Sequence, residues 1–217
     1  MSGNTTAGTA TRRGWALLIT LLVAATSCSS GGGSEAAEPP GYTRQPVPNV
    51  SAVSLPVAGT GKAFPLRAPT RQLRVVFFGF TSCPVECPTT LSDLKRAVQR
   101  LPSADRRRVT VGLISVDLQR DSSDRLADYV GRIFTTRVPS GVGLRAADDP
   151  ALRTAANGLG ASYSVTPNAD GTPNITHSTE IYAIDDRGRV VRQWPFGTTP
   201  SEFAGEFAAL LAGQRLT

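Results

Sequence analysis

Residues 73–91 read LRVVFFGFTSCPVECPTTL, and this stretch decides the fold. It opens with a continuous apolar run at residues 73–80, which is typical of a strand buried on both faces of a sheet. Two cysteines follow, Cys83 and Cys87, each directly before a proline. Apolar residues then recur with helical spacing from residue 88 to residue 101, and a proline suits the first helical position. The cysteines are therefore expected in the turn between a central strand and its helix.

The elements downstream of this stretch complete an α/β pattern. Hydrophobic periodicity and turn signals predict strand 109–116, helix 122–134, a short strand at 142–146, helix 150–158, hairpin strands 178–185 and 189–194, and helix 200–212. A βαβ start and a ββα finish describe an α/β protein with a thioredoxin-like fold, whose central mixed sheet is flanked by helices. The turn with the cysteines lies at the carboxyl end of a central strand, where open α/β sheets place ligands and chemistry.

The first 27 residues predict export from the cytoplasm. Arg12 and Arg13 precede the apolar run WALLITLLVAA at residues 15–25, and small residues then lead to Cys28. This order is that of a signal peptide of the lipoprotein type, and the apolar run is shorter than the about 20 residues that span a membrane. Cys28 is expected to be the lipidated first residue, although an uncleaved anchor stays open. Both alternatives place the domain at the cell membrane, on its extracytoplasmic face.

Residues 28–50 are rich in Gly, Ser, Pro and Glu, which predicts a lipidated cysteine followed by a flexible tether. Such a tether has a root-mean-square reach of roughly 25 Å. The folded domain would then occupy residues 51–217. The net charge of +6 is scattered along the chain. The one basic run, at residues 106–108, has no interleaved aromatic residues, so it predicts a solvated corner and no nucleic-acid partner.

The spacing of Cys83 and Cys87 limits what the two thiols can do. A disulfide between them would close a ring of only five residues and would stabilise the fold little, because stabilisation grows with loop length. Positions i and i+4 of a helical turn place Cβ atoms about 5–6 Å apart, whereas a disulfide needs about 3.8 Å. The spacing favours a shared metal, while a redox pair remains possible. A helix N-terminus would also favour the thiolate form of Cys87.

His177 is the only histidine in the chain. It is expected at the entry of the 178–185 strand, after the polar loop TPNADGTPN, and in this fold that strand edge lies beside the cysteine turn. The sequence therefore predicts a metal site formed by Cys83, Cys87 and His177. Two thiolates and one imidazole suit Cu(I), Cu(II) or zinc.

Three motifs together resemble the SCO/SenC family of copper-binding, thioredoxin-like proteins. They are GFTSCPVECPTTL at 79–91, SVDLQRD at 115–121 and THSTEIYAIDDRG at 176–188, and the resemblance covers about residues 50–212. It implies a membrane-tethered chaperone that binds copper, as Cu(I) or Cu(II), through Cys83, Cys87 and His177. The family's acceptor is the dinuclear copper centre of cytochrome c oxidase subunit II, and another copper acceptor stays open. In the family, some members are thought to reduce the cysteines of that subunit instead.

Copper delivery would make the chain a metallochaperone, whereas reduction of the acceptor's cysteines would make it an enzyme. A chaperone passes copper by ligand exchange, whereas a thiol–disulfide reductase uses Cys83 and Cys87 as its catalytic pair. The extra residue relative to a C-x-x-C motif and the available histidine favour the chaperone. A thiol peroxidase and an inert binding module are weaker alternatives. The chain lacks the sequence pattern of the peroxidases, and an inert module leaves the histidine unexplained.

Three further positions match the family's acidic–Arg–acidic stretch: Asp117, Arg120 and Asp121. They could support the ligands or dock a partner, or they could form a surface ion pair and a helix cap. The chain also departs from the family pattern at two positions. Val85 stands where an aspartate is usual, with Glu86 after it, and Thr176 stands where an aspartate often precedes the histidine.

Overall fold

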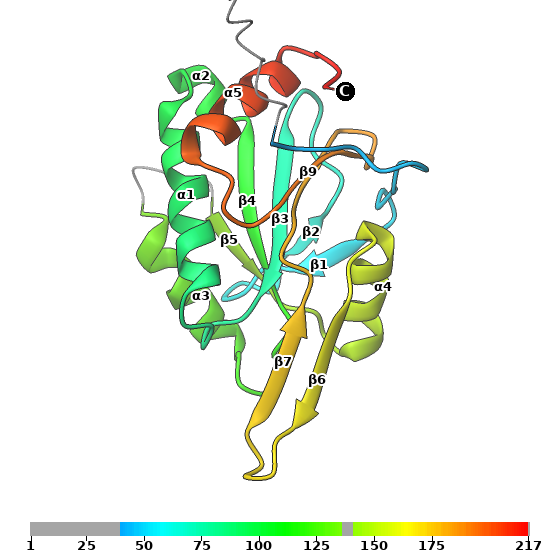
Figure 1. Cartoon of the computed structure of the whole chain (residues 1–217), viewed down its shortest axis with the longest axis vertical. Coiled ribbons are helices and arrows are strands. Elements are labelled where there is room, and N and C mark those ends of the chain that lie inside the picture. Colours follow the sequence, from blue (N-terminus) through cyan, green and yellow to red (C-terminus); the bar gives the residue numbers. More distant parts are fainter. Residues whose placement is uncertain (1–39, 136–140, 217) are drawn as a thin grey trace, which may run out of the picture. The chain divides into compact units, whose positions relative to one another are not determined.

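The computed structural model of the chain describes residues 40–135 and 141–216. Its main sheet has five strands in the order β5-β4-β3-β8-β9 (Figure 1). Their bounds are β3 (Leu73–Gly79), β4 (Val109–Ser115), β5 (Gly141–Leu144), β8 (Ile181–Ile184) and β9 (Val190–Trp194). Strands β3, β4 and β5 run parallel, whereas β8 and β9 are antiparallel to their neighbours. The predicted central mixed sheet is confirmed.

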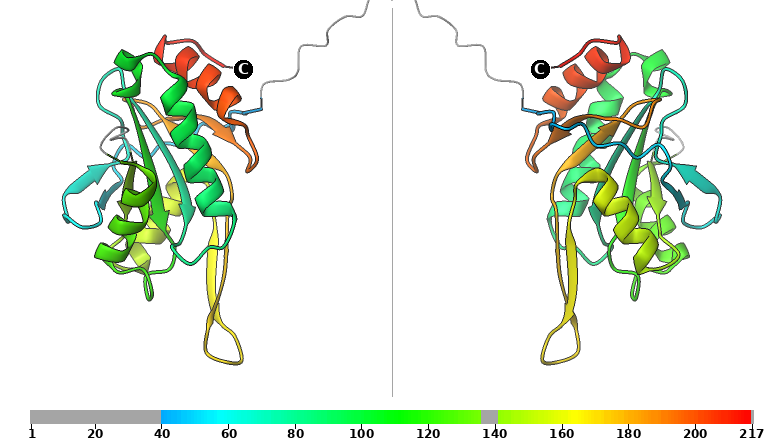
Figure 2. Two further views of the ribbon diagram at one scale, coloured as in Figure 1. Left: turned by 90° about the vertical axis from the view of Figure 1, so that its left-hand side faces the viewer. Right: turned by 90° about the vertical axis from the view of Figure 1, so that its right-hand side faces the viewer.

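Helices cover both faces of this sheet (Figure 2). One face carries α1 (Glu86–Arg100), α3 (Ser123–Ile133) and α5 (Pro200–Leu211), and the other carries α4 (Asp149–Leu159). A short helix, α2 (Ser103–Arg106), connects α1 to β4. The thioredoxin-like arrangement predicted from the order of elements is therefore present.

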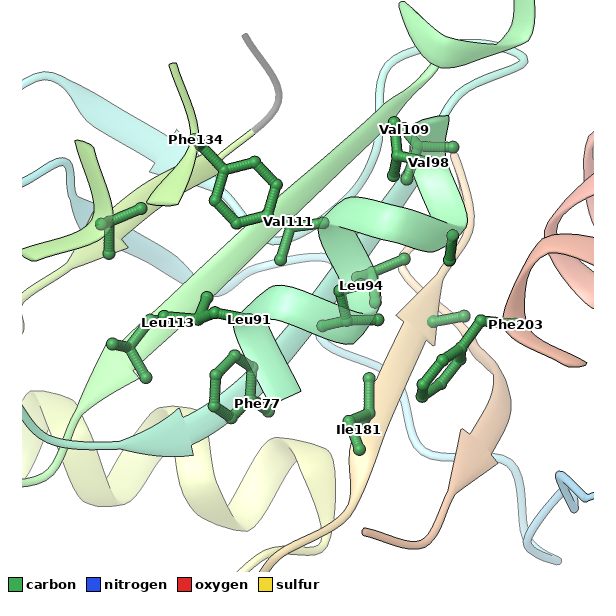
Figure 3. Close-up of a cluster of buried hydrophobic side chains, with 14 of the residues drawn as sticks. Phe77, Leu91, Leu94, Val98, Val109, Val111, Leu113, Phe134, Ile181 and Phe203 are labelled. Atoms are coloured by element: carbon green, nitrogen blue, oxygen red, sulfur yellow. The ribbon is translucent and has the colours of Figure 1, made fainter. Parts of the chain in front are cut away.

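Alternate side chains of β3 build the two hydrophobic layers. Phe77 packs on the α1 face with Leu91 and Leu94 (Figure 3). Val76 and Phe78 point to the opposite face, into a layer that includes residues of α4. The small sheet of β1 (Ser54–Pro56) and β2 (Ala63–Pro65) contributes to this second layer. Both faces of β3 are thus buried, which explains its continuous apolar run.

A second small sheet, which the sequence did not predict, projects from the domain (Figures 1 and 2). It is the hairpin of β6 (Tyr163–Pro167) and β7 (Pro173–His177), which includes the segment expected to be a polar loop. Most side chains of β6 are exposed, so neither face produces the apolar alternation that marks a strand. His177 is consequently the last residue of β7, and β8 begins only at Ile181.

The tether was predicted to extend to residue 50, but its described part, residues 40–50, does not behave as a tether. Tyr42 and Asn49 form isolated bridges with Gln193 and Arg189, and Val50 is buried. Residues 42–50 therefore lie along the outer edge of the sheet, where backbone groups of β9 would otherwise lack partners. A composition rich in proline and glycine does not prevent such edge pairing.

The predicted signal peptide, Cys28 and the first part of the tether lie outside the described residues. Within residues 40–135 and 141–216, no helix is long and apolar enough to cross a membrane.

Candidate metal centre

The two cysteines lie where β3 leads into α1, as predicted. Cys83 is in the connecting loop, and Cys87 is in the first turn of α1, which starts two residues earlier than expected, at Glu86. The backbone N–H of Cys87 donates a hydrogen bond of 3.3 Å to the Cys83 sulfur. Both thiols are free, and they are 8% and 1% exposed. The start of α1 thus places the two cysteines next to each other without a disulfide between them.

The expectation that the helix terminus favours the Cys87 thiolate is contradicted. Burial raises the pKa of the Cys87 thiol well above its ordinary value, and the hydrogen bond with Cys83 adds to the rise. A hydrogen bond from the Phe80 backbone acts in the opposite direction but is the smaller effect. Desolvation of the charged form therefore outweighs the helix dipole, and the metal-free protein holds Cys87 as a thiol.

His177 is fixed with one ring nitrogen available. Its Nδ1 lies 2.9 Å from the carbonyl oxygen of Ser178. Since a carbonyl can only accept, Nδ1 carries a proton, and Nε2 is the ring nitrogen that a metal can bind. The ring also packs edge-to-face on Phe80, with ring centroids 6.0 Å apart. Phe80 belongs to the loop that leads to Cys83, so it connects the histidine to the cysteine loop.

Cys87 and His177 line the same small cavity, which has room for about one water-sized sphere. Glu86 and Phe196 also border it. Cys83 is not among the lining residues. Within residues 40–135 and 141–216, no group of three His, Cys, Asp or Glu side chains is arranged to hold a metal ion. The fold therefore brings the predicted ligands to one end of the sheet, but the full ligand set is not preassembled.

The hairpin that ends in His177 is attached to the domain at its base. Tyr163 pairs directly with His177 across the hairpin, and its hydroxyl donates to a carboxylate oxygen of Asp149 on α4, at 2.6 Å. Ser178 donates its backbone N–H to the Ser162 carbonyl at 2.9 Å. The histidine thus belongs to a segment held by α4 as well as by its own strand pair.

Asp121 is completely buried and holds the loop before Cys83. Its carboxylate accepts from the Thr81 backbone N–H at 3.0 Å, the Thr81 hydroxyl at 2.5 Å and the Ser115 hydroxyl at 2.6 Å. Arg125 reinforces this attachment by donating to the hydroxyls of Thr81 and Ser82. The alternative that Asp121 caps a helix is wrong, because Ser122 is the N-cap of α3.

Asp117 and Arg120 form an ion pair next to Asp121. The Asp117 side chain is fully buried, so this is not the surface pair considered as an alternative. The Arg120 guanidinium lies over the Phe80 ring, 5.9 Å from its centroid. Phe80 therefore contacts both Arg120 and His177. The sequence pattern singled out the acidic residues, but nothing in it pointed to Phe80, Thr81, Ser115 or Arg125.

The two departures from the family pattern have different outcomes. Val85 is 62% exposed and does not line the cavity, whereas Glu86 does, so a carboxylate still lies beside the site. Thr176 is exposed, and the proton of His177 Nδ1 goes to a backbone carbonyl instead of a neighbouring carboxylate.

Known proteins that resemble the chain share this architecture. The model of the SCO1/SenC family matches residues 57–212. A relative from Stutzerimonas stutzeri is 29% identical over 114 residues, which are 52% of this chain and 53% of the relative. A SCO2-like protein of Rickettsia conorii is 26% identical over 133 residues, which are 60% of this chain and 62% of that protein. The matched segments thus span about half to three fifths of these relatives.

Two solved structures show the same fold at higher coverage. ScoI of Bradyrhizobium japonicum with copper bound is 26% identical and has a TM-score of 0.62, over 72% of this chain and 95% of that one. Apo Sco1 of Thermus thermophilus is 27% identical with a TM-score of 0.67, over 78% and 95% of the two chains. With the family model matching most of its length, the chain belongs to the SCO1/SenC family.

Proposed function

We propose that the chain is a membrane-tethered copper chaperone on the extracytoplasmic face of the cell membrane. It binds one copper ion and delivers it for assembly of the dinuclear copper centre in cytochrome c oxidase subunit II. The observation that carries this proposal is the cavity shared by Cys87 and by a His177 ring whose Nε2 is free to bind a metal. The copper-bound structure of the related ScoI supports the choice of metal.

The residues present fit copper as cargo. Two thiolates and one neutral imidazole form a donor set that suits Cu(I) in particular, because sulfur ligands are soft. Copper replaces the thiol protons, so binding releases protons from Cys83 and Cys87. The three groups must also move closer together, since the described residues hold no ready three-ligand cluster. The Phe80 contact and the hairpin base are the places where such a movement would occur.

Delivery by ligand exchange needs an open side for the acceptor. Val85 and Phe196 are two large apolar side chains that are exposed beside the cysteines and the histidine. An acceptor that packs on them can bring its own thiolates to the metal and replace the chaperone's ligands one at a time. The destination in subunit II rests on the family resemblance of the three motifs, and the lipid anchor at Cys28 belongs to the same proposal.

The neighbouring free thiols favour one second candidate function. A thiolate of Cys83 or Cys87 would attack an acceptor disulfide and form a mixed disulfide, and the other cysteine would then displace the acceptor. The acceptor leaves as a dithiol, and Cys83 and Cys87 become a disulfide, so two electrons pass to the acceptor. This reaction gives His177 no direct part.

Oxidase activity in cells separates the two functions. Cells that lack the chain would be complemented with the wild type, Cys87→Ser, His177→Ala and Asp128→Ala, the last being an exposed residue of α3 and a matched control. The chaperone predicts that Cys87→Ser and His177→Ala are equally deficient, and that added copper relieves the deficiency. A normal oxidase with His177→Ala but not with Cys87→Ser would instead establish the reductase.

A further inference from the structure

A groove lined by arginines lies at the end of the domain opposite the cysteines. It is bordered by the turn before β3, the β8–β9 turn, the segment after α5 and residues 43–47. In Figure 1 these segments are at the opposite end from the β6–β7 hairpin. We call it the arginine groove, and its charged lining residues are Arg71, Arg108, Arg187, Arg189, Arg215, Asp185 and Asp186.

The arginine groove has more positive charge than its own acidic residues neutralise. Arg189 pairs with Asp185 at 2.7 Å, and Arg108 pairs with Asp105 at 2.7 Å. The guanidinium groups of Arg71, Arg187 and Arg215 have no hydrogen-bond or ion-pair partner within the described part of the chain, and all three residues are exposed. These three unpaired charges are available to an anionic ligand.

Arg71 has a backbone conformation that an arginine rarely adopts. Its φ is +61°, in the left-handed region where glycine costs least. Its N–H donates to the Asp186 carboxylate at 3.2 Å, and its carbonyl accepts from Arg108 Nε at 2.8 Å. The surrounding structure thus keeps a strained turn whose side chain faces the groove. Strained residues of this kind cluster at active sites and ligand-binding sites.

We propose that the arginine groove binds the phosphate headgroups of an anionic membrane. Guanidinium groups match phosphate oxygens in charge and geometry, and basic residues near a membrane attract anionic lipids. Residues 43–47 line the groove, so the chain enters the domain at this face. Only 11 residues separate Cys28 from Pro40, and they span at most about 40 Å. The groove is therefore within reach of a membrane that holds the chain at Cys28.

Binding at this end would give the domain a fixed orientation. The cysteines and His177 lie at the carboxyl ends of β3 and β7, away from the groove, so the copper site would face away from the lipid surface. This inference goes beyond copper binding, and it rests on the membrane attachment at Cys28 that the proposed function includes.

Vesicle sedimentation tests the proposal. Residues 29–217 contain both hydrophobic layers and lack Cys28, so any binding comes from the domain itself. The protein would be mixed at low salt with vesicles of phosphatidylcholine alone or with phosphatidylglycerol added. We expect partitioning only to the anionic vesicles, and we expect Arg71→Gln combined with Arg187→Gln to lower it by about 25-fold, or about fivefold per charge.

The control is Arg96→Gln combined with Arg132→Gln, which removes the same charge from exposed positions on α1 and α3. It should partition nearly as the wild type does. The proposal would be overturned if both double variants lost vesicle binding equally. It would also be overturned if Arg71→Gln combined with Arg187→Gln bound the anionic vesicles as well as the wild type does. Saturable binding of inorganic phosphate by the protein in solution, without any partitioning to the anionic vesicles, would also overturn it, because the groove would then be a site for the free anion.

A second variant keeps the test independent of folding defects. Arg71→Gly removes the charge and relieves the left-handed strain, so it should unfold at a higher urea concentration than the wild type while binding anionic vesicles about fivefold less. Unchanged vesicle binding by this variant would contradict the proposal.

Discussion

Asp121 shows how much one buried carboxylate contributes to the cysteine loop. It lies in the stretch after β4, yet it accepts two hydrogen bonds from Thr81, in the loop after β3. The sequence identified Asp121 through a family motif but could not assign its partners, because the pairing joins residues that are 40 positions apart. Residue types alone indicate that a carboxylate is present, whereas only the fold determines which N–H and hydroxyl groups it satisfies.

Replacing Asp121 should therefore destabilise the protein strongly. In Asp121→Ala the Thr81 N–H and the Ser115 hydroxyl lose a charged acceptor inside the protein, and we expect a loss of about 3 kcal/mol in the free energy of unfolding. Urea denaturation measures it, with Asp128→Ala expected to stay within about 0.5 kcal/mol of the wild type. A loss no larger for Asp121→Ala than for this exposed control would show that the hydrogen bonds contribute nothing.

The raised pKa of the Cys87 thiol makes the stability of the metal-free protein depend on pH. Burial raises its pKa above the ordinary value of 9.0, so the unfolded chain gives up this proton first as pH rises. The stabilisation is complete below about pH 9 and is lost as pH rises toward the folded-state pKa. Between pH 8.5 and 10 the free energy of unfolding should fall more steeply in the wild type than in Cys87→Ala. Parallel curves would contradict the predicted burial of the thiol.

At the scale of elements, the contact between β3 and α1 positions the Cys87 sulfur. A Cβ atom added at Gly79 would lie 2.6 Å from Cys87 Sγ and 2.9 Å from Leu113 Cδ1. Because Gly79, the last residue of β3, has no side chain, the Cys87 thiol can occupy this space. The sequence predicted both elements, since their apolar patterns are strong, but it missed the β6–β7 hairpin, whose exposed faces have no such pattern.

Gly79→Ala should accordingly weaken copper binding, because the added methyl group displaces the Cys87 sulfur. We expect the Cu(I) affinity to fall by at least about tenfold, which competition with a coloured chelator measures. Gly131→Ala is the matched control, since an added Cβ there meets nothing within 4 Å. That control should bind copper normally and be more stable by up to about 1 kcal/mol. Normal copper binding by Gly79→Ala would mean that the sulfur position is not constrained by β3.

At the scale of the whole molecule, topology brings together residues that are about 90 positions apart. The β3–α1 turn supplies Cys83 and Cys87, and the end of β7 supplies His177, at the same end of the sheet. The sequence could predict this convergence because the order of elements indicates the fold. It could not predict that the metal-free ligands stay apart, or that Cys87 remains protonated, because both depend on packing and burial around the loop.

The most direct test of the account is an anaerobic Cu(I) titration of residues 29–217, reduced beforehand, against a coloured chelator. The wild type should bind one copper ion tightly, and His177→Ala should bind it at least about tenfold more weakly. Asp128→Ala should match the wild type. Weak binding that His177→Ala leaves unchanged would contradict the copper site and would leave Cys83 and Cys87 as a redox pair.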